Sequence, residues 1–243
     1  MIEIELNPLL NWEQLAQQYH SKARIQIGNF LTESSIERIL QCLQKEISWH
    51  LAYYDGKARL LSHEDLRKKT PEEVRNLQAH LAKVASSSAF HYIYDCYPLI
   101  RAYKEKWEPD LYLNRWLEFI NGEVFLKVMR KLTGHADITR ADSQATRYSQ
   151  NQYLTRHNDD VPAEVRRAAY VLNITKNWDP NWGGYLQFFN KGKNLDDGFI
   201  PEFNTLNVFS VPQDHSVGCI SQFAQRYRYT MVGWLRGPEE LEF

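Results

Sequence analysis

The feature that most constrains the fold is a change after Gly134, where the chain becomes a series of short segments rich in β-branched and aromatic residues. Turn-forming residues, such as the run Asn158-Asp159-Asp160, separate these segments. Too few helices lie between them for a parallel sheet of strand–helix–strand units. The pattern predicts an antiparallel sandwich or jelly roll, with strands at 143–149, 153–157, 168–174, 185–189, 205–211, 216–221 and 226–235.

The first half of the chain predicts helices. Ser34 and Glu37 suggest a capping box at the start of an amphipathic pattern. The segment 70–73, Thr-Pro-Glu-Glu, places an N-cap, a proline and a box glutamate before a second helix that ends near Ser86. A third helical region spans 111–132, is interrupted by an Asn-Gly pair and is closed by a glycine. We expect these helices to be packing elements.

No internal repeat, low-complexity tract or linker divides the chain. With 243 residues, of which 43% are hydrophobic, it is long enough to bury a substantial core. We therefore expect a single domain over 1–243 that is mainly β with helices (α+β). Residues 1–135 form a helical support with the first strands, and residues 136–236 form a double-stranded β-helix (jelly roll) with the N-terminal helices packed on one sheet.

Charge and cysteine content argue against several classes of function. Lys and Arg number 29 against 30 Asp and Glu, so the formal net charge of −1 offers no general attraction to nucleic acid or to an anionic membrane. Cys42, Cys96 and Cys219 are odd in number and include no C-x-x-C pair, which argues against a disulfide framework and a thiolate zinc site. No segment has the pattern of an export signal or a membrane span. We expect a cytoplasmic protein.

Two histidines and an aspartate form a candidate metal site. Side chains alternate along a strand with a period of two, so His157 and Asp159 are expected on one face of the strand that begins at 153. His215 opens a second strand, and a jelly roll can bring the two strands together. Two histidines and one carboxylate form the facial triad of non-haem iron oxygenases. Taken alone, each part has an ordinary explanation: H-x-D occurs by chance, and a lone histidine is more often a surface or capping residue.

An arginine in an apolar strand adds a second constraint. Arg228 lies within the predicted strand 226–235. Burying a guanidinium without a partner is very costly, whereas its planar fork matches a carboxylate in bidentate geometry. A bound dicarboxylate would explain the residue. Pairing with a protein carboxylate, or exposure to solvent, would also explain it.

Taken in order, these features resemble the prolyl-hydroxylase-like branch of the iron(II)- and 2-oxoglutarate-dependent oxygenases. The resemblance covers roughly 136–236. It rests on Tyr148, Tyr153-x-x-x-His157-x-Asp159, Tyr170-Val171-Leu172-Asn173 with Trp178, Gly183-Gly184-x-Leu186, His215, and Arg228 with Gly233-Trp234.

The resemblance implies an enzyme that uses iron(II), 2-oxoglutarate and dioxygen. Iron would be held by His157, Asp159 and His215, and Arg228 would pair with the distal carboxylate of 2-oxoglutarate. In this family, oxidative decarboxylation of 2-oxoglutarate to succinate drives the hydroxylation of a nearby C–H bond. The carboxylate ligand argues against halogenation, because the family's halogenases replace it with a small residue.

The resemblance also assigns Tyr148, Leu186 and Trp234 to the co-substrate pocket. Family members often have a tyrosine two residues before the asparagine of the Tyr-Leu-Asn strand. Here that position is Val171, and the tyrosine is Tyr170. Part of the usual hydrogen bonding to 2-oxoglutarate is therefore missing or supplied by another residue.

The resemblance favours a prolyl residue of a protein or peptide as substrate, with a free amino acid or another small molecule as the alternative. A nucleic-acid demethylase would carry a second arginine at Trp234, and a zinc hydrolase would leave Arg228 unexplained. A non-catalytic 2-oxoglutarate-binding protein is the remaining alternative, although such proteins typically lose a metal ligand. Substrate specificity is expected in the loops 50–69, 158–167 and 190–202, the last of which is a mobile lid or an ordinary hairpin loop.

Overall fold

The computed structural model describes residues 2–161 and 163–238 of the chain. Within that part, the helices are α1 (Trp12–Lys22), α2 (Glu33–Lys45), α3 (His63–Lys68), α4 (Pro71–Ala85), α5 (Leu99–Glu105), α6 (Leu113–Ile120) and α7 (Glu123–Thr133), with a 3-10 turn at Pro180–Trp182. The strands are β1 (Arg24–Ile27), β2 (His50–Tyr54), β3 (Ala58–Ser62), β4 (Tyr92–Tyr97), β5 (Arg140–Ala141), β6 (Gln144–Tyr148), β7 (Tyr153–His157), β8 (Arg166–Asn173), β9 (Leu186–Phe189), β10 (Leu195–Phe199), β11 (Thr205–Ser210), β12 (His215–Val217) and β13 (Arg228–Arg236).

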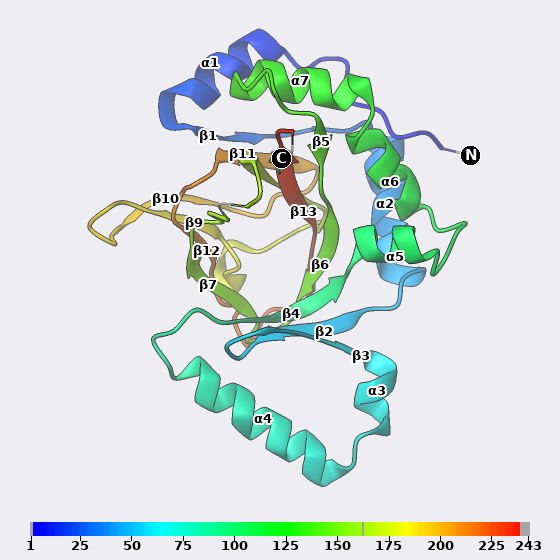
Figure 1. Ribbon diagram of the computed structural model, residues 1–243, viewed down its shortest axis with the longest axis vertical. Helices are drawn as coiled ribbons and strands as arrows, with labels where there is room; N and C mark the ends of the chain where they lie inside the picture. The colour runs from blue at the N-terminus through cyan, green and yellow to red at the C-terminus, as the bar shows by residue number, and fades with distance from the viewer. Residues whose placement is uncertain (1, 162, 239–243) are drawn as a thin grey trace, which may run out of the picture.

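The strands form one antiparallel sheet that wraps into a nearly closed barrel (Figure 1). Along the sheet the order is β1-β11-β8-β13-β6-β4-β7-β12-β9-β10. Arg24 of β1 forms ion pairs with Asp196 and Asp197 of β10, so side chains link the first and last strands of this order. The predicted double-stranded β-helix is confirmed.

Every strand predicted after Gly134 is present, and the structure adds β5 and β10. β10 was missed because its sequence, Leu-Asp-Asp-Gly-Phe, has the composition of a loop. It pairs only with β9, and its register shifts between Leu195 and Asp197. The segment 190–202 is therefore largely a β-hairpin at the edge of the sheet.

The prediction of a helical first half was incomplete, because β1 to β4 lie there. β4 is the most important omission, since it lies between β6 and β7 and pairs with both. Its sequence, Tyr-Ile-Tyr-Asp-Cys-Tyr, alternates in the way expected of a strand. The run is short and lies between two helical regions, and its partners are more than forty residues away in the sequence, as the pairing of Asp95 with Arg147 illustrates.

One of the two predicted capping boxes is confirmed and the other is wrong. The Thr70 hydroxyl accepts a hydrogen bond from the Glu73 amide, and the Glu73 carboxylate accepts one from the Thr70 amide. At α2 the N-cap is Thr32, so Ser34 and Glu37 lie inside the helix and form no box. The neighbouring threonine, with its extended backbone, starts the helix two positions earlier than the sequence pattern indicated.

The main core lies between the outer face of the barrel and helices α1, α2, α5, α6 and α7 (Figure 1). The interruption predicted near residue 121 divides α6 from α7, and Asn121 exchanges two hydrogen bonds of 3.0 Å with the main chain of Ala141.

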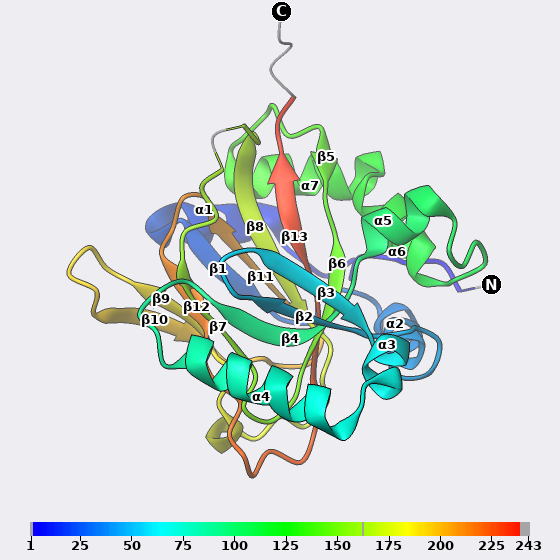
Figure 2. The same cartoon turned by 60° about the horizontal axis from the view of Figure 1, so that its bottom comes forward.

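Helix α4 is the exception to the expected packing. It has no buried residue and lies beyond β2 to β4, in the foreground of Figure 2. No helix in 2–161 or 163–238 is long and apolar enough to cross a membrane.

At Gly233, β13 packs closely against the main chain of Asp142. A Cβ at this position would overlap the main-chain oxygen of Asp142, which also accepts a hydrogen bond of 2.7 Å from the Tyr170 hydroxyl. Gly233→Ala should therefore lower the free energy of unfolding by about 1–3 kcal/mol, the range for overpacking. Gly28→Ala is the matched control, because a Cβ there meets open space. Urea denaturation followed by circular dichroism measures both, and equal midpoints for the two variants would contradict the packing argument.

Candidate functional site

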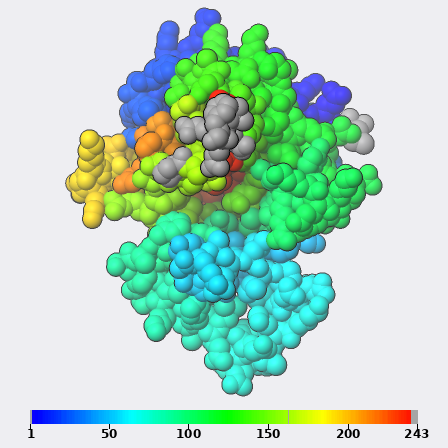
Figure 3. Space-filling model, viewed as in Figure 1, coloured from blue at the N-terminus to red at the C-terminus, as the bar shows by residue number. Residues whose placement is uncertain are grey.

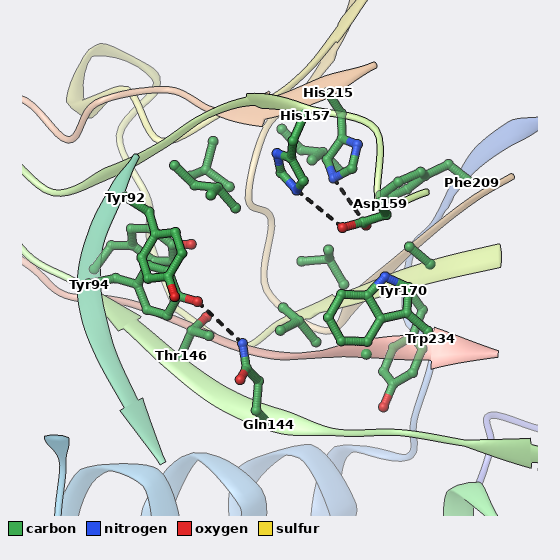
Figure 4. Close-up of a pocket in the computed structure, with 18 of the residues that line it drawn as sticks. Tyr92, Tyr94, Gln144, Thr146, His157, Asp159, Tyr170, Phe209, His215 and Trp234 are labelled. Carbon is green, nitrogen blue, oxygen red and sulfur yellow. Dashed lines mark hydrogen bonds and ion pairs between the residues drawn. The ribbon is translucent and has the colours of Figure 1, made fainter. Parts of the chain in front are cut away.

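Two strands and a turn bring the three candidate metal ligands together. His157 ends β7 and His215 begins β12, and the antiparallel pairing of these strands places the two histidines opposite each other. Asp159 lies beyond the end of β7 in a left-handed conformation (φ 61°). One ligand atom from each side chain lies within 4.8 Å of the others (Figure 4). A turn, and not the predicted strand alternation, therefore directs the Asp159 carboxylate toward the histidines.

Hydrogen bonds on the far side of each imidazole fix its orientation. Nδ1 of His157 lies 2.9 Å from the carbonyl oxygen of Thr155, and Nδ1 of His215 lies 2.8 Å from that of Gln213. A carbonyl oxygen only accepts, so Nδ1 donates in both residues and the lone pair is left on Nε2. The Nε2 atoms lie 3.3 and 3.4 Å from the two carboxylate oxygens of Asp159. All the ligand atoms thus face one small volume.

The charges of these groups suit a cation. Burial alone would raise the pKa of the Asp159 carboxyl, but contact with His157 and the charge of His215 outweigh it and lower the pKa to about 2. Burial, together with the nearby His157, lowers the pKa of His215 to about 4. At neutral pH the protein therefore presents a carboxylate and a neutral imidazole, which are the forms that bind metal ions.

Arg228 lies at the start of β13, opposite Tyr148 of β6, and is 1% exposed. Its Nη2 donates to Oδ1 of Asn173 at 3.2 Å, and its guanidinium lies 5.4 Å from the centre of the Tyr148 ring. Nε has no hydrogen-bond partner, and no carboxylate in the described part of the chain pairs with this arginine. Burial lowers the pKa of Arg228 to about 10, so it stays protonated at neutral pH. The two protein-based explanations of this arginine, a carboxylate partner and solvent exposure, therefore fail.

A cavity of about 340 Å³ connects the three ligands with Arg228. One wall is a row of stacked tyrosines from β4 and β6, with ring centres 5.0 Å apart between Tyr92 and Tyr94 and again between Tyr94 and Tyr148. The opposite wall is apolar and includes Val171 and Leu186. The volume lies within the usual range of small-molecule sites. The cavity is therefore lined both by the three candidate metal ligands and by a cation without a carboxylate partner in the described residues, and it has room for a small dicarboxylate.

Comparison with known proteins identifies this arrangement. Residues 143–236 match the 2OG-Fe(II) oxygenase superfamily. The match covers less than half of the chain. Members of this superfamily use iron(II), 2-oxoglutarate and dioxygen, which is the predicted cofactor set.

Individual relatives agree with the prolyl-hydroxylase-like branch. The chain is 28% identical over 142 residues to prolyl 3-hydroxylase OGFOD1 of Mus musculus, a match that covers 56% of this chain and 25% of the mouse protein. It thus spans about a quarter of that relative's length. The fold is similar to a prolyl-4-hydroxylase of Pseudomonas putida (TM-score 0.58, 14% identity, 94% of this chain and 100% of the other). It is also similar to a 2OG-Fe(II) oxygenase family oxidoreductase of Burkholderia pseudomallei (TM-score 0.58, 11% identity, 98% and 99%).

The other residues assigned to the oxygenase pocket from sequence all line it. The guanidinium of Arg228 lies over the Tyr148 ring, and Leu186 is among the lining residues. Trp234 lies near Asp159 (Figure 4). Arg166 from β8 lies over the Trp234 indole, with its guanidinium carbon 3.8 Å from the ring centre.

Sequence reasoning missed Tyr92, Tyr94, Gln144, Thr146 and Arg166, all of which line the same cavity. The two tyrosines lie on β4, the strand that was not predicted. Their signal was present in the alternation of aromatic residues along that strand. Its meaning depends on β4 being inserted between β6 and β7, a non-local pairing that a local pattern does not indicate.

Val171 stands where family members often have a tyrosine, and the tyrosine lies one position earlier, at Tyr170. This difference has a structural consequence. Tyr170 packs against Trp116 and Phe125 in the main core, and its hydroxyl donates to a main-chain oxygen. Val171 packs on the cavity side with Leu186. Tyr170 also lines the cavity, but its hydroxyl is bonded to the main-chain oxygen of Asp142. Val171 adds no hydroxyl to the wall, and the other phenols that line the cavity come from β4 and β6.

Two adjacent glycines pack closely against the segment 219–220, and the second also lies beside Arg228. Gly183 and Gly184 both have positive φ, 74° and 69°. A Cβ on Gly183 would overlap the main-chain oxygen of Cys219, and one on Gly184 would overlap the Ile220 side chain and lie 3.1 Å from Cδ of Arg228. Close packing and backbone conformation therefore both favour glycine at these two positions.

The geometry predicts one divalent cation per chain, bound by His157, Asp159 and His215. In the absence of oxygen, calorimetric titration of chelator-treated protein with Mn²⁺ should give a stoichiometry near one. His215→Ala should weaken binding by more than the roughly 10–100-fold typical of losing an outer hydrogen-bond partner, because it removes a ligand itself. His20→Ala, at an exposed position outside the site, is the control. Equal affinities for the two variants would contradict the assignment.

Proposed function

We propose that the chain is an iron(II)- and 2-oxoglutarate-dependent dioxygenase that hydroxylates a C–H bond of a prolyl residue in a protein or peptide. The observation that carries the proposal is the buried Arg228, which pairs with no carboxylate in 2–161 or 163–238 and shares a cavity with two histidines and an aspartate. An anionic co-substrate with two carboxylates accounts for both features of that cavity.

In this proposal His157, Asp159 and His215 hold the iron, and Arg228 holds the distal carboxylate of 2-oxoglutarate. Iron, 2-oxoglutarate and dioxygen together supply the oxidation, in which one oxygen atom enters the substrate C–H bond while 2-oxoglutarate becomes succinate and carbon dioxide. Tyr148 supports Arg228 from below. The protein's own contribution is to position the reacting groups and to exclude water from them.

The tyrosines of the cavity act as neutral hydrogen-bond donors. Burial raises the pKa of Tyr94 well above its usual value, and burial also raises that of Tyr148 despite the opposing charge of Arg228. Both phenols therefore keep their protons at neutral pH. We infer that they complete the polar contacts of the co-substrate, in place of the hydroxyl that Val171 lacks. Leu186 and Trp234 complete the walls around it.

The prolyl substrate is supported by the relatives, since the mouse protein is named a prolyl 3-hydroxylase and the Pseudomonas structure a prolyl-4-hydroxylase. A free amino acid or another small molecule is the alternative substrate. The whole chain would act as one catalytic domain, because β4 of the first half is inserted into the sheet of the second. We further propose a cytoplasmic protein that does not act on nucleic acid, in accord with three free cysteines and a net charge of −1.

Incubation with iron(II), 2-oxoglutarate and cell lysate tests the substrate class. We expect +16 Da products on prolines of lysate peptides, together with succinate release, and neither when 2-oxoglutarate is omitted. Mass spectrometry of peptides and metabolites in separate fractions measures both. Hydroxylated metabolites without modified peptides would replace the prolyl substrate by a small molecule. Binding of 2-oxoglutarate without any product would support a non-catalytic binding protein.

Arg228→Ala tests the co-substrate assignment. It should weaken 2-oxoglutarate binding by about 1.5–3 kcal/mol, the range for hydrogen bonds to charged groups and roughly ten- to a hundredfold in affinity. Mn²⁺ binding should be nearly unchanged, because Arg228 is not one of the three ligands. Arg226→Ala, two positions away at an exposed site, is the matched control. If Arg228→Ala binds 2-oxoglutarate as tightly as the parent protein, the assignment is wrong.

A further inference from the structure

A second cavity, which we call the α5 groove, adjoins the active-site pocket. Pro98, Ile100 and Lys104 line one side of it, and Gln144 and Trp234 line the other. The last two also line the active-site pocket, so the two cavities meet at these side chains. Figure 3 shows the surface of the molecule from the same side as Figure 1, with the cyan segment below the green ones.

The groove exists because β4 stops short. Its pairing with β6 ends at Tyr97 and Ala145, and Pro98, which has no N–H to continue the ladder, begins the turn into α5. A helix therefore lies beside the end of β6, where a strand would otherwise continue (Figure 1). Leu99 of this helix is buried in the main core, whereas Ile100 is only half-buried and does not belong to that core. An apolar side chain is thus presented to the groove.

The wall shared by the two cavities is held in place. The guanidinium of Arg166 lies 3.8 Å from the centre of the Trp234 ring, and Arg166 in turn bonds to Glu164 at 2.8 Å and to the main-chain oxygen of Asp159 at 3.1 Å. Trp234 is therefore fixed between the metal ligands and the groove. A chain that passes this tryptophan from the groove enters the active-site pocket.

The dimensions of the groove suit a few residues of extended chain. Its volume is about 400 Å³. Helix α5 has 7 residues and so runs for about 10 Å at roughly 1.5 Å per residue. An extended peptide advances by about 3.3 Å per residue, so about three residues would lie along the helix. A free amino acid would occupy the active-site pocket and leave this groove empty.

The charge of the groove is positive. Arg101 donates to the Glu105 carboxylate at 2.9 Å, so these two charges offset each other. Lys104 forms no ion pair with any acidic residue in 2–161 or 163–238. One uncompensated cation therefore remains beside Ile100 and Pro98, and it favours an acidic side chain in whatever occupies the groove.

We propose that the α5 groove binds the segment of a polypeptide substrate next to the hydroxylated residue, and that Lys104 favours an acidic side chain in that segment. The inference rests on the proposed function and extends it, because it selects a polypeptide over a free amino acid. It also gives a role in substrate binding to α5, which lies outside the segment that matches the superfamily.

The test uses a library of blocked heptapeptides with a central proline and varied flanks, and N-acetylproline methylamide as a minimal substrate. Mass spectrometry measures +16 Da on the central proline. The parent protein should convert heptapeptides at least tenfold more efficiently than the minimal substrate. It should prefer Asp or Glu on one flank by about two- to fivefold, the range for an exposed ion pair.

Two groove variants and one control sharpen the test. Ile100→Asp should raise KM for the heptapeptides about tenfold with little change in kcat, and Lys104→Glu should reverse the charge preference on the same flank. Val124→Asp, on the exposed surface of α7, should change neither quantity. Titration with 2-oxoglutarate checks that each variant keeps an intact co-substrate site.

Two different failures can be told apart. If the parent protein modifies heptapeptides but the two groove variants match it in KM and flank preference, the α5 groove is not the binding site and the proposed function stands. If the parent protein binds 2-oxoglutarate but modifies neither the peptides nor the minimal substrate, the prolyl-hydroxylase proposal itself is overturned. The inference about the groove then falls with it.

Discussion

The burial of one cation with no counter-ion among the described residues is the constraint on which the site depends. A guanidinium as completely enclosed as that of Arg228 is very costly to desolvate, and its partners within 2–161 and 163–238 are Asn173 and the face of Tyr148. Replacing such a residue by an apolar one would ordinarily be neutral or stabilising. The surrounding structure instead accommodates it, with Gly184 lacking a side chain where the arginine stem passes. In the proposed function an anionic co-substrate completes the site and offsets this cost.

The candidate metal ligands follow from a different principle, in which strand pairing sets the positions of two of the side chains. His157 and His215 are opposite each other in one antiparallel ladder, so their separation is set by main-chain hydrogen bonds. Asp159 requires a departure from that regularity, since it lies past the strand with a left-handed backbone. Arg166 bonds to its carbonyl oxygen and helps to hold that conformation. The site thus combines two ligands fixed by the sheet with one fixed by a braced turn.

These two parts of the site explain what a sequence can and cannot reveal. The sequence pointed to His157, Asp159, His215 and Arg228 as candidates because each is a polar residue in or next to a strand pattern that local alternation makes visible. The geometry that gathers them was only partly foreseen, because the left-handed turn at Asp159 replaces the expected strand alternation. Whether a carboxylate elsewhere in the chain neutralises the arginine depends on tertiary packing, which local patterns do not encode. The same limit hid β4: its alternation was visible, but its position between β6 and β7 is set by pairings with residues far along the chain.

The insertion of β4 also determines which parts of the chain line the cavity. The segment that matches the superfamily, 143–236, carries the metal ligands and the arginine, whereas Tyr92 and Tyr94 reach the cavity from the first half. The same strand continues through Pro98 into α5, which lies beside the mouth of the cavity. The candidate metal ligands and the arginine thus come from one part of the chain, and the α5 groove is lined largely by another. Both parts contribute strands to one sheet. Changes in the first half can alter what reaches the metal without disturbing its ligands, because β4 touches the pocket wall and none of the three ligands lies on it. Such a division is the physical basis on which one oxygenase core can serve different substrates.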